Sequence, residues 1–409
     1  MQDRERTLRS ARHASRSGRV AAAGLMVAAA AVLASAAKAE PTLKIGVLGV
    51  MSGPSASWGL VSKYSAEAGA AMYNEKGGVE IGGEKYKIEI VSVDDKADPK
   101  LAVTGAQRLI LKEGIKYIIG PNVDSTIASA EPVAEQNGAM MVSYSFTRSL
   151  FSPPHHNTVL GIVPGYQTGP VVYKYLMDHQ GLKTISFLVV NTAEGLKQRD
   201  ESVAAATKLG LKVLAGDSAY EVGATDFFPI VSKVVDQKPD LIVLSGVAPA
   251  DAPKLIKAAR ELGYKGLLEA ETAQDINILE QGAGAAAEGF LSLGGASTPE
   301  IRSAYMDDFI KHYLAVAGEW NDEAGTKAYA LEMIVRTLQK TGKAGIDDIE
   351  AFKKAIPDFA TPNPFLKDQT TLRYVGEAYF QQQRQIGLPM VINTIKDGKF
   401  QTLFIGAVE

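Results

Sequence analysis

The chain has 409 residues, enough for two domains of ordinary size, and its 46% hydrophobic and 22% charged residues are typical of a folded globular protein. It contains no cysteine, which excludes disulfides, thiolate metal sites and cysteine nucleophiles. The formal net charge is −3.

Residues 1–39 have the layout of a secretory signal peptide. Six arginines precede an apolar run over residues 20–37, and Ala37-Lys38-Ala39 offers a small-x-small cleavage site. The run is also long enough for a membrane anchor, but it is mostly alanine, which favours cleavage after Ala39. Cleavage would remove seven basic and two acidic residues and change the formal charge from −3 to −8. We therefore expect the mature chain to be located in the periplasm. Its acidic charge argues against a nucleic-acid partner.

The first part of the mature sequence alternates strand-like and helix-like segments. Asp98-Pro99 marks one helix start, since an N-cap residue precedes a proline at the first helical position. Pro132 is expected to kink its Ala-rich helix rather than end it, because the apolar pattern continues beyond it. The predicted strands are 43–50, 85–93, 117–119 and 140–142, and the helices begin near 59, 101 and 126.

The alternation restarts beyond Ser152-Pro153-Pro154, which indicates a second block of the same kind. We predict strands at 184–190, 211–214, 241–244 and 267–268, with helices between them, and a connector strand at 159–164. Residues 288–293 then lead away from this block. Helices at 300–317, 323–340 and 346–356 follow, and a strand-rich tail begins near 372.

The C-terminal helices must pack against a sheet, and without them the first block would lack its full set of helices. We therefore expect the chain to cross between two α/β lobes three times, near residues 163, 295 and 373. The predicted first lobe comprises 40–163 and 295–373, and the second comprises 164–294 and 374–409.

Residues 116–148 contain two strands, each followed by small polar residues. Ligands of parallel α/β sheets bind beyond the carboxyl ends of strands, and a helix N-terminus suits a carboxylate. Asp124 and Ser125, in the first of these loops, are candidate ligand residues, although capping the following helix would also explain them.

Three stretches resemble the type I periplasmic binding proteins, and most of all the leucine/isoleucine/valine-binding proteins of ABC transporters. They are LKIGVLGVMSGPSASWG at 43–59, the stretch from NEKGG to KLAV at 74–103, and KYIIGP at 116–121. The resemblance implies two Rossmann-like lobes with parallel-type central sheets, joined by a three-strand hinge and closing on one small molecule.

The resemblance also implies roles for individual residues. An amino-acid carboxylate would meet Ser125 (or Asp124) and Phe146-Thr147 of the first lobe, and its ammonium group would meet Glu271 of the second lobe. Trp58 would line the side-chain pocket. Tyr144 is a candidate ligand contact, and packing in the core explains it equally well.

Two departures from the family pattern favour a different ligand. Family members often carry tyrosines in the second-lobe loops, where this chain has Asn191-Thr192-Ala193 and Val247-Ala248-Pro249. Arg148 adds a cation that could pair with a carboxylate, although an exposed surface arginine is the more common case. An aromatic or other small carboxylic acid is therefore the rival to a branched-chain amino acid.

Catalysis is not expected. No nucleophile elbow or phosphate-binding lysine motif is present, and adjacent His155-His156 would point to opposite faces if extended. The sequence predicts a monomeric receptor that needs no metal or cofactor and delivers a small carboxylate to the membrane permease of an ABC importer. A periplasmic ligand sensor with the same fold is the alternative.

Overall fold

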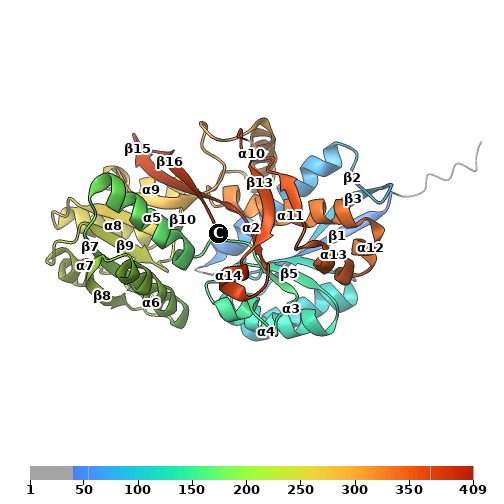
Figure 1. The fold of residues 1–409 in the computed structure, drawn as a ribbon, viewed down its shortest axis with the longest axis horizontal. Helices are drawn as coiled ribbons and strands as arrows, with labels where there is room; N and C mark the ends of the chain where they lie inside the picture. Colours follow the sequence, from blue (N-terminus) through green and yellow to red (C-terminus); the bar gives the residue numbers. More distant parts are fainter. Residues whose placement is uncertain (1–39, 54, 369, 409) are drawn as a thin grey trace, which may run out of the picture. The chain divides into compact units, whose positions relative to one another are not determined.

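The structure, a computed structural model, describes residues 40–53, 55–368 and 370–408; the expected signal peptide and its cleavage site lie outside the described residues. The unit from Thr42 onward contains two sheets of mostly parallel strands. We call each sheet with its covering helices a lobe. The predicted α/β fold is confirmed, and Figure 1 shows its arrangement.

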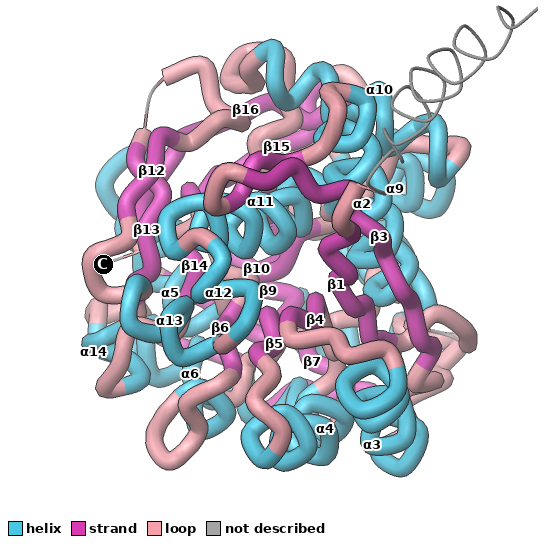
Figure 2. Tube along the Cα trace, turned by 90° about the vertical axis from the view of Figure 1, so that its right-hand side faces the viewer, coloured by secondary structure: helices cyan, strands magenta, loops and turns pink. Residues whose placement is uncertain are grey.

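Parallel pairing dominates the centre of the first sheet, and antiparallel strands extend both of its edges. Figure 2 shows these strands side by side. Their spatial order is β12 (Ala360–Pro362), β13 (Thr371–Val375), β14 (Gln385–Ile386), β6 (Thr158–Leu160), β5 (Met140–Ser143), β4 (Tyr117–Ile119), β1 (Thr42–Gly49), β3 (Glu84–Asp94) and β2 (Val79–Ile81).

The second sheet has five parallel strands and an antiparallel pair at one edge. Its order is β16 (Lys399–Ala407), β15 (Pro389–Lys396), β11 (Leu291–Gly294), β10 (Leu267–Ala273), β9 (Leu241–Ser245), β7 (Thr184–Val190) and β8 (Lys212–Tyr220).

Helices follow most parallel strands. The first lobe has α2 (Ala56–Glu75), α3 (Pro99–Gln107), a π-helical turn at Arg108–Lys112, α4 (Asp124–Gln136), a 3-10 turn at Arg148–Phe151, α10 (Ala304–Ala317), α11 (Ala324–Thr341), α12 (Lys343–Asp347), α13 (Ile349–Ala355) and α14 (Glu377–Phe380). The second has α5 (Gly165–Gln180), α6 (Ala193–Lys208), α7 (Phe228–Val235), α8 (Ala252–Glu261), α9 (Ile276–Ala283) and a 3-10 turn at Gly284–Ala287.

Alternating strand side chains explain why helices cover both faces of each sheet. In β1, Ile45 and Val47 pack in a cluster with α2 and α11, whereas Leu48 packs in another cluster with α3 and α4. In β9, Leu241 and Val243 face one cluster while neighbouring residues of the strand face the side of α7 and α8.

Local signals in the sequence act as expected at two helices of the first lobe. The Asp98 side chain accepts hydrogen bonds from the backbone N–H groups of Lys100 and Leu101 at the start of α3. Helix α4 runs through Pro132 without ending.

The chain passes between the sheets after β6, after β11 and after β14. The third passage therefore lies at residues 387–388, not near 373 as predicted. Leu372 and Tyr374 alternate into the first-lobe core, and β13 and β14 extend the first sheet. Only β15 and β16 of the tail join the second sheet.

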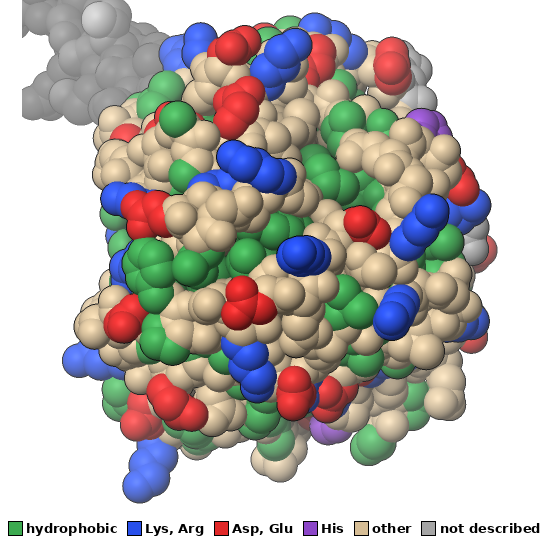
Figure 3. All heavy atoms as spheres, turned by 90° about the vertical axis from the view of Figure 1, so that its left-hand side faces the viewer, with side chains coloured by type: hydrophobic (Ala, Val, Ile, Leu, Met, Phe, Trp, Pro, Cys, Tyr) green, Lys and Arg blue, Asp and Glu red, His purple; other side chains and the backbone are tan. Residues whose placement is uncertain are grey.

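The face at the end of the second lobe, shown in Figure 3, carries acidic and basic side chains interspersed with each other. None of the helices formed by the described residues has both the length and the apolar character needed to cross a membrane.

Candidate functional site

Polar side chains follow the carboxyl ends of parallel strands in both sheets, and two contacts between the sheets bring these edges together. Arg148, which follows β5, pairs with Glu201 of α6 at 3.1 Å. The backbone N–H of Asp322, which precedes α11, donates to Asp275, which follows β10, at 3.1 Å. The carboxyl edges of the two sheets therefore face each other, which is where a ligand of such sheets binds.

Asp124 brings the two polar loops of the first lobe together. It is the first residue of α4, and its carboxylate oxygens accept hydrogen bonds from the hydroxyl groups of Ser145 and Thr147. The Thr147 backbone N–H donates to Ser145 Oγ at 2.9 Å. The helix N-terminus and two hydroxyl donors favour a negative charge here, and the protein supplies that charge itself.

The other first-lobe candidates lie around this centre. Ser125 is exposed beside Asp124, Phe146 is half-buried, and Tyr144 is buried. Trp58 is half-buried in the first turn of α2, and its backbone carbonyl accepts a hydrogen bond from Asn122 Nδ2 at 3.3 Å. This bond ties the loop after β4 to the start of α2.

Arg148 has protein partners from both lobes. Its guanidinium lies 4.1 Å from the ring centroid of Tyr166 in α5 and 5.5 Å from that of Tyr379 in α14. Its ion pair with Glu201 crosses from the first lobe to the second. In this arrangement Arg148 connects the lobes, and a role in ligand binding stays a prediction.

Glu271 lies inside the second lobe with 1% of its surface exposed. Its carboxylate accepts hydrogen bonds from Tyr173 Oη at 2.7 Å, Ser245 Oγ at 2.8 Å and Gln198 Nε2 at 3.3 Å. Burial raises the pKa of Glu271, while these hydrogen bonds act in the opposite direction.

The two remaining second-lobe candidates lie near the ends of β7 and β9. Asn191 is exposed, and its side-chain amide donates to Glu221 at 2.8 Å. Ala248 is half-buried, and its carbonyl accepts the backbone N–H of Asp251 at 2.9 Å. Neither position carries an aromatic ring.

A family model described as "Periplasmic binding protein" matches residues 42–399. The chain belongs to the periplasmic binding protein family. One relative of this periplasmic binding protein is the Leu/Ile/Val-binding protein of Citrobacter freundii, which is 29% identical over 254 residues. That alignment covers 61% of this chain and 66% of the relative, just under two thirds of its length.

Solved structures share the fold of this periplasmic binding protein. A branched-chain amino acid transporter substrate binding protein of Streptococcus pneumoniae, in complex with isoleucine, aligns with a TM-score of 0.73 and 20% identity, covering 90% of this chain and 99% of that one. A solute binding protein of R. palustris, in complex with benzoate, aligns with a TM-score of 0.72 and 18% identity, covering 90% and 97%. These likenesses show the type I fold that the sequence resemblance implied.

The periplasmic binding protein also has buried ionisable side chains that the sequence did not indicate as site residues. Lys327 of α11 is 8% exposed, and its ammonium group lies 3.5 Å from the centroid of the Tyr144 ring. Burial lowers the pKa of Lys327 to about 8, and Glu323, four residues earlier, partly offsets this. Glu269, two residues before Glu271, is also buried, and burial raises its pKa well above the ordinary value.

A reciprocal pair of aspartates joins the second-lobe loop before α9 to the first-lobe loop before α11. Asp275 accepts the backbone N–H of Asp322, and Asp322 accepts the backbone N–H of Ile276, both at 3.1 Å. Burial raises the pKa of Asp322 to about 6 and also raises that of Asp275. Asp275 also caps α9, since its side chain accepts the backbone N–H of Ile278, but no local pattern around either aspartate predicts a contact between the lobes.

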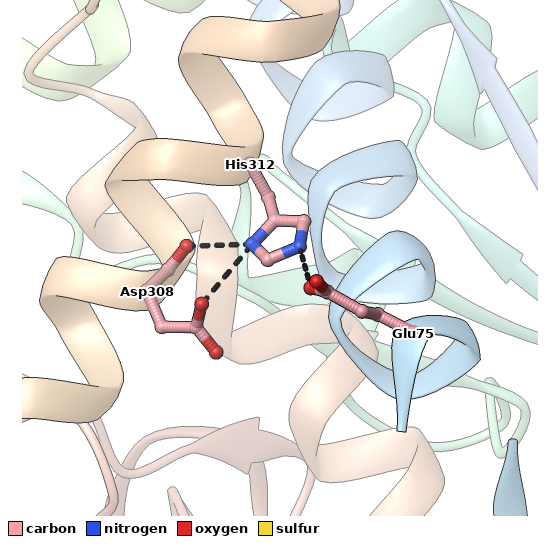
Figure 4. A group of neighbouring side chains, drawn as sticks. All are labelled: Glu75, Asp308 and His312. Atoms are coloured by element: carbon pink, nitrogen blue, oxygen red, sulfur yellow. Dashed lines mark hydrogen bonds and ion pairs between the residues drawn. The ribbon is translucent and has the colours of Figure 1, made fainter. Parts of the chain in front are cut away.

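Glu75, Asp308 and His312 form the group of possible metal ligands found among the described residues, drawn in Figure 4. His312 Nε2 lies 2.8 Å from Glu75 Oε2, and His312 Nδ1 lies 2.8 Å from the Asp308 carbonyl. Lys76 also pairs with Asp308 at 3.1 Å. Protein partners therefore account for the group, which holds α2 against α10.

Proposed function

We propose that this chain is the periplasmic solute-binding component of an ABC importer and captures an amino acid, branched-chain or related, by closing its two lobes. The observation that carries the proposal is the meeting of two polar strand edges through the Arg148–Glu201 and Asp275–Asp322 contacts. We assign Asp124 and Thr147 to the first-lobe side of the site and Glu271 to the second-lobe side. The relative from Citrobacter freundii and the isoleucine complex support the amino-acid class.

Closure follows from where the recognition groups lie. A ligand that contacts both lobes interacts with them together only in the closed arrangement, so it shifts the population toward closure by its differential affinity. The Arg148–Glu201 and Asp275–Asp322 contacts cross the same interface. They would stabilise the closed arrangement that a permease receives.

Further features of the proposal rest on the sequence. Export by a signal peptide cleaved after Ala39, a periplasmic location, a monomeric state and delivery to a membrane permease are all part of it. No catalytic step and no cofactor belong to it. A periplasmic ligand sensor would use the same lobes, and copurification with a permease rather than a signalling receptor would favour transport.

A second ligand class, aromatic or other small carboxylic acids, has specific support. Asp124 already occupies the Ser145 and Thr147 hydroxyl groups, and Glu271 already has three protein donors. An amino acid would have to displace these bonds, whereas an acid without an amine need not engage Glu271 at all. The benzoate-bound solute binding protein of R. palustris shares the fold.

Replacing Glu271 with Gln separates the two ligand classes. The change keeps the shape of the side chain and removes the charge that would pair with an ammonium group, so an amino acid should bind at least about tenfold more weakly. Binding of a simple acid should change little. Calorimetric titration with L-isoleucine and with benzoate measures both affinities.

Glu261→Gln, an exposed carboxylate of α8, is the matched control and should leave both affinities unchanged. A thermal-shift screen first identifies which compounds bind. Stabilisation reaches about 2.7 kcal/mol at a hundred times the dissociation constant. If no amino acid or carboxylic acid shifts the unfolding temperature, the proposed function is wrong.

A further inference from the structure

Lys327 occupies an unusual place for a lysine. It lies one turn into α11, whose start is held to the second lobe by the Asp275–Asp322 pair. Its ammonium group lies 3.5 Å from the ring centroid of Tyr144, which follows β5. Lys327 therefore lies at the carboxyl edge of the first sheet, on the side where the two lobes meet.

The charge of Lys327 is buried and incompletely compensated. Only 8% of the residue is exposed, and among the described residues it has neither a hydrogen-bond acceptor nor an ion-pair partner within 4.0 Å. The negative charge of Glu323, the N-cap residue of α11, and the face of the Tyr144 ring favour the charged form of Lys327. Asp275 of the second lobe disfavours the charged form of Glu323. Burying a lysine without a hydrogen-bonded anion is costly, so such residues are rare without a functional reason.

Three other groups at this edge that could bind an anion already have protein partners. The hydroxyl groups of Ser145 and Thr147 donate to Asp124, so a ligand carboxylate placed there would meet a negative charge. Arg148 is paired with Glu201 across the lobes. Among the residues that the structure describes, none accepts a hydrogen bond from the Lys327 ammonium group, and a carboxylate is the group that satisfies its three N–H donors best.

We propose that Lys327 binds the carboxylate of the solute, and that the ligand class is therefore carboxylic acids for which an amine is not required. This inference rests on the proposed solute-binding function and deepens it. The carboxylate approaches the ammonium group beside the Tyr144 ring. The ligand thereby supplies the charge that the protein leaves uncompensated.

The test measures how strongly binding depends on the carboxylate, with and without Lys327. Benzoate, 3,4-dihydroxybenzoate and L-isoleucine, each with its amide, are titrated into the wild type, K327M and K327R. In the wild type, each bound acid should be preferred over its amide by about tenfold or more, as a charge-assisted hydrogen bond implies. K327M should reduce this preference toward equality, while K327R should retain most of it.

Two controls separate ligand recognition from a structural role. Lys63, 5.2 Å from the Tyr64 ring on the surface of α2, is the matched lysine, and K63M should leave the preference intact. The unfolding temperature of ligand-free K327M should be equal to or above that of the wild type, because an incompletely paired buried charge is replaced by an apolar side chain.

The outcomes distinguish this inference from the proposed function. The role of Lys327 alone would be overturned if K327M kept the wild-type preference for acids over amides. It would also be overturned if ligand-free K327M were less stable than the ligand-free wild type. Equal binding of acids and amides by the wild type would do the same. If no compound of the panel binds, the solute-binding function itself is contradicted.

Discussion

Asp124 determines which charge the first lobe presents to a ligand. Its carboxylate lies among hydroxyl donors at the start of a helix, an environment that would also suit the carboxylate of a ligand. The choice between an aspartate and a neutral residue at this position therefore decides whether the loop repels or attracts an anion.

Asp124→Ser should strengthen the binding of carboxylate ligands by about tenfold, since it removes a negative charge and frees the Ser145 and Thr147 hydroxyl groups. It should also lower the free energy of unfolding by about 1–3 kcal/mol, because two hydrogen bonds to a charged acceptor are lost. Calorimetry and urea unfolding measure the two effects.

The exposed Asp217 of β8 offers a control, and Asp217→Ser should change neither quantity appreciably. Weaker binding of carboxylates by Asp124→Ser would show that the carboxylate of Asp124 supports ligand binding instead of opposing it.

The sequence predicts the structural surroundings of some site residues but not of others. The loops holding Asp124, Thr147 and Glu271 were predicted from strand ends and the family resemblance, and the structure brings Asp124 and Thr147 together. The sequence did not indicate Lys327 as a site residue, because a lysine in the first turn of a helix is usually exposed to solvent. Its burial depends on Tyr144, a residue distant in the sequence, so no local pattern reveals it.

At the scale of elements, two helices of the first lobe are joined through one imidazole. His312 of α10 lies between Glu75 of α2 and the Asp308 carbonyl, both at 2.8 Å. The Nε2 contact joins α10 to α2, and the Nδ1 contact is made to a carbonyl of the same helix, α10.

His312→Leu should lower the free energy of unfolding by about 1–3 kcal/mol, because it removes hydrogen bonds to a carboxylate and to a backbone carbonyl. Urea unfolding at neutral pH measures the change. The exposed His179, stacked on Tyr175, is the matched control, and His179→Leu should cost less than about 0.5 kcal/mol. Equal effects of the two substitutions would contradict the bridging role of His312.

The aspartate pair between the lobes predicts a pH dependence. The pKa of Asp322 is raised from 3.8 to about 6. At pH between these values the folded protein keeps a proton on Asp322 that the unfolded chain has released. The stabilisation from this raised pKa is therefore fully present below about pH 3.8 and is lost as the pH rises through about 6.

Asp322→Asn should remove this contribution. Between pH 4 and 7 the free energy of unfolding of the wild type should fall by about 1–3 kcal/mol relative to the variant, while other titrating groups cancel in the difference. Urea unfolding of both proteins across this range is the measurement. Parallel curves would exclude Asp322 as a source of the dependence.

Predicting the elements succeeded where strong local signals exist, as at the Asp98 cap and through Pro132. The position of the C-terminal tail was harder to predict. Its alternating pattern predicts strands, but alternation does not specify which sheet a strand joins. Pairing of β14 with β6 and packing of Tyr374 decide this, and both are long-range interactions.

At the scale of the whole chain, the account depends on two lobes that bind a solute together. Three passages of the chain, after β6, β11 and β14, join the sheets. At the second passage, Gly295 lies so close to Gly325 that an added Cβ would lie 2.1 Å from the Gly325 carbonyl carbon. The start of α11, which carries Lys327, is thus held against the connection between the lobes.

The most direct test measures the distance between the lobes with and without a bound acid. Because the chain has no cysteine, L111C/V222C places one spin label on an exposed site of each lobe. Pulsed dipolar spectroscopy should show a broad distance distribution without ligand and a single narrow one with a saturating carboxylate that the thermal-shift screen identifies. An identical distribution in both conditions would contradict ligand-dependent closure of the lobes.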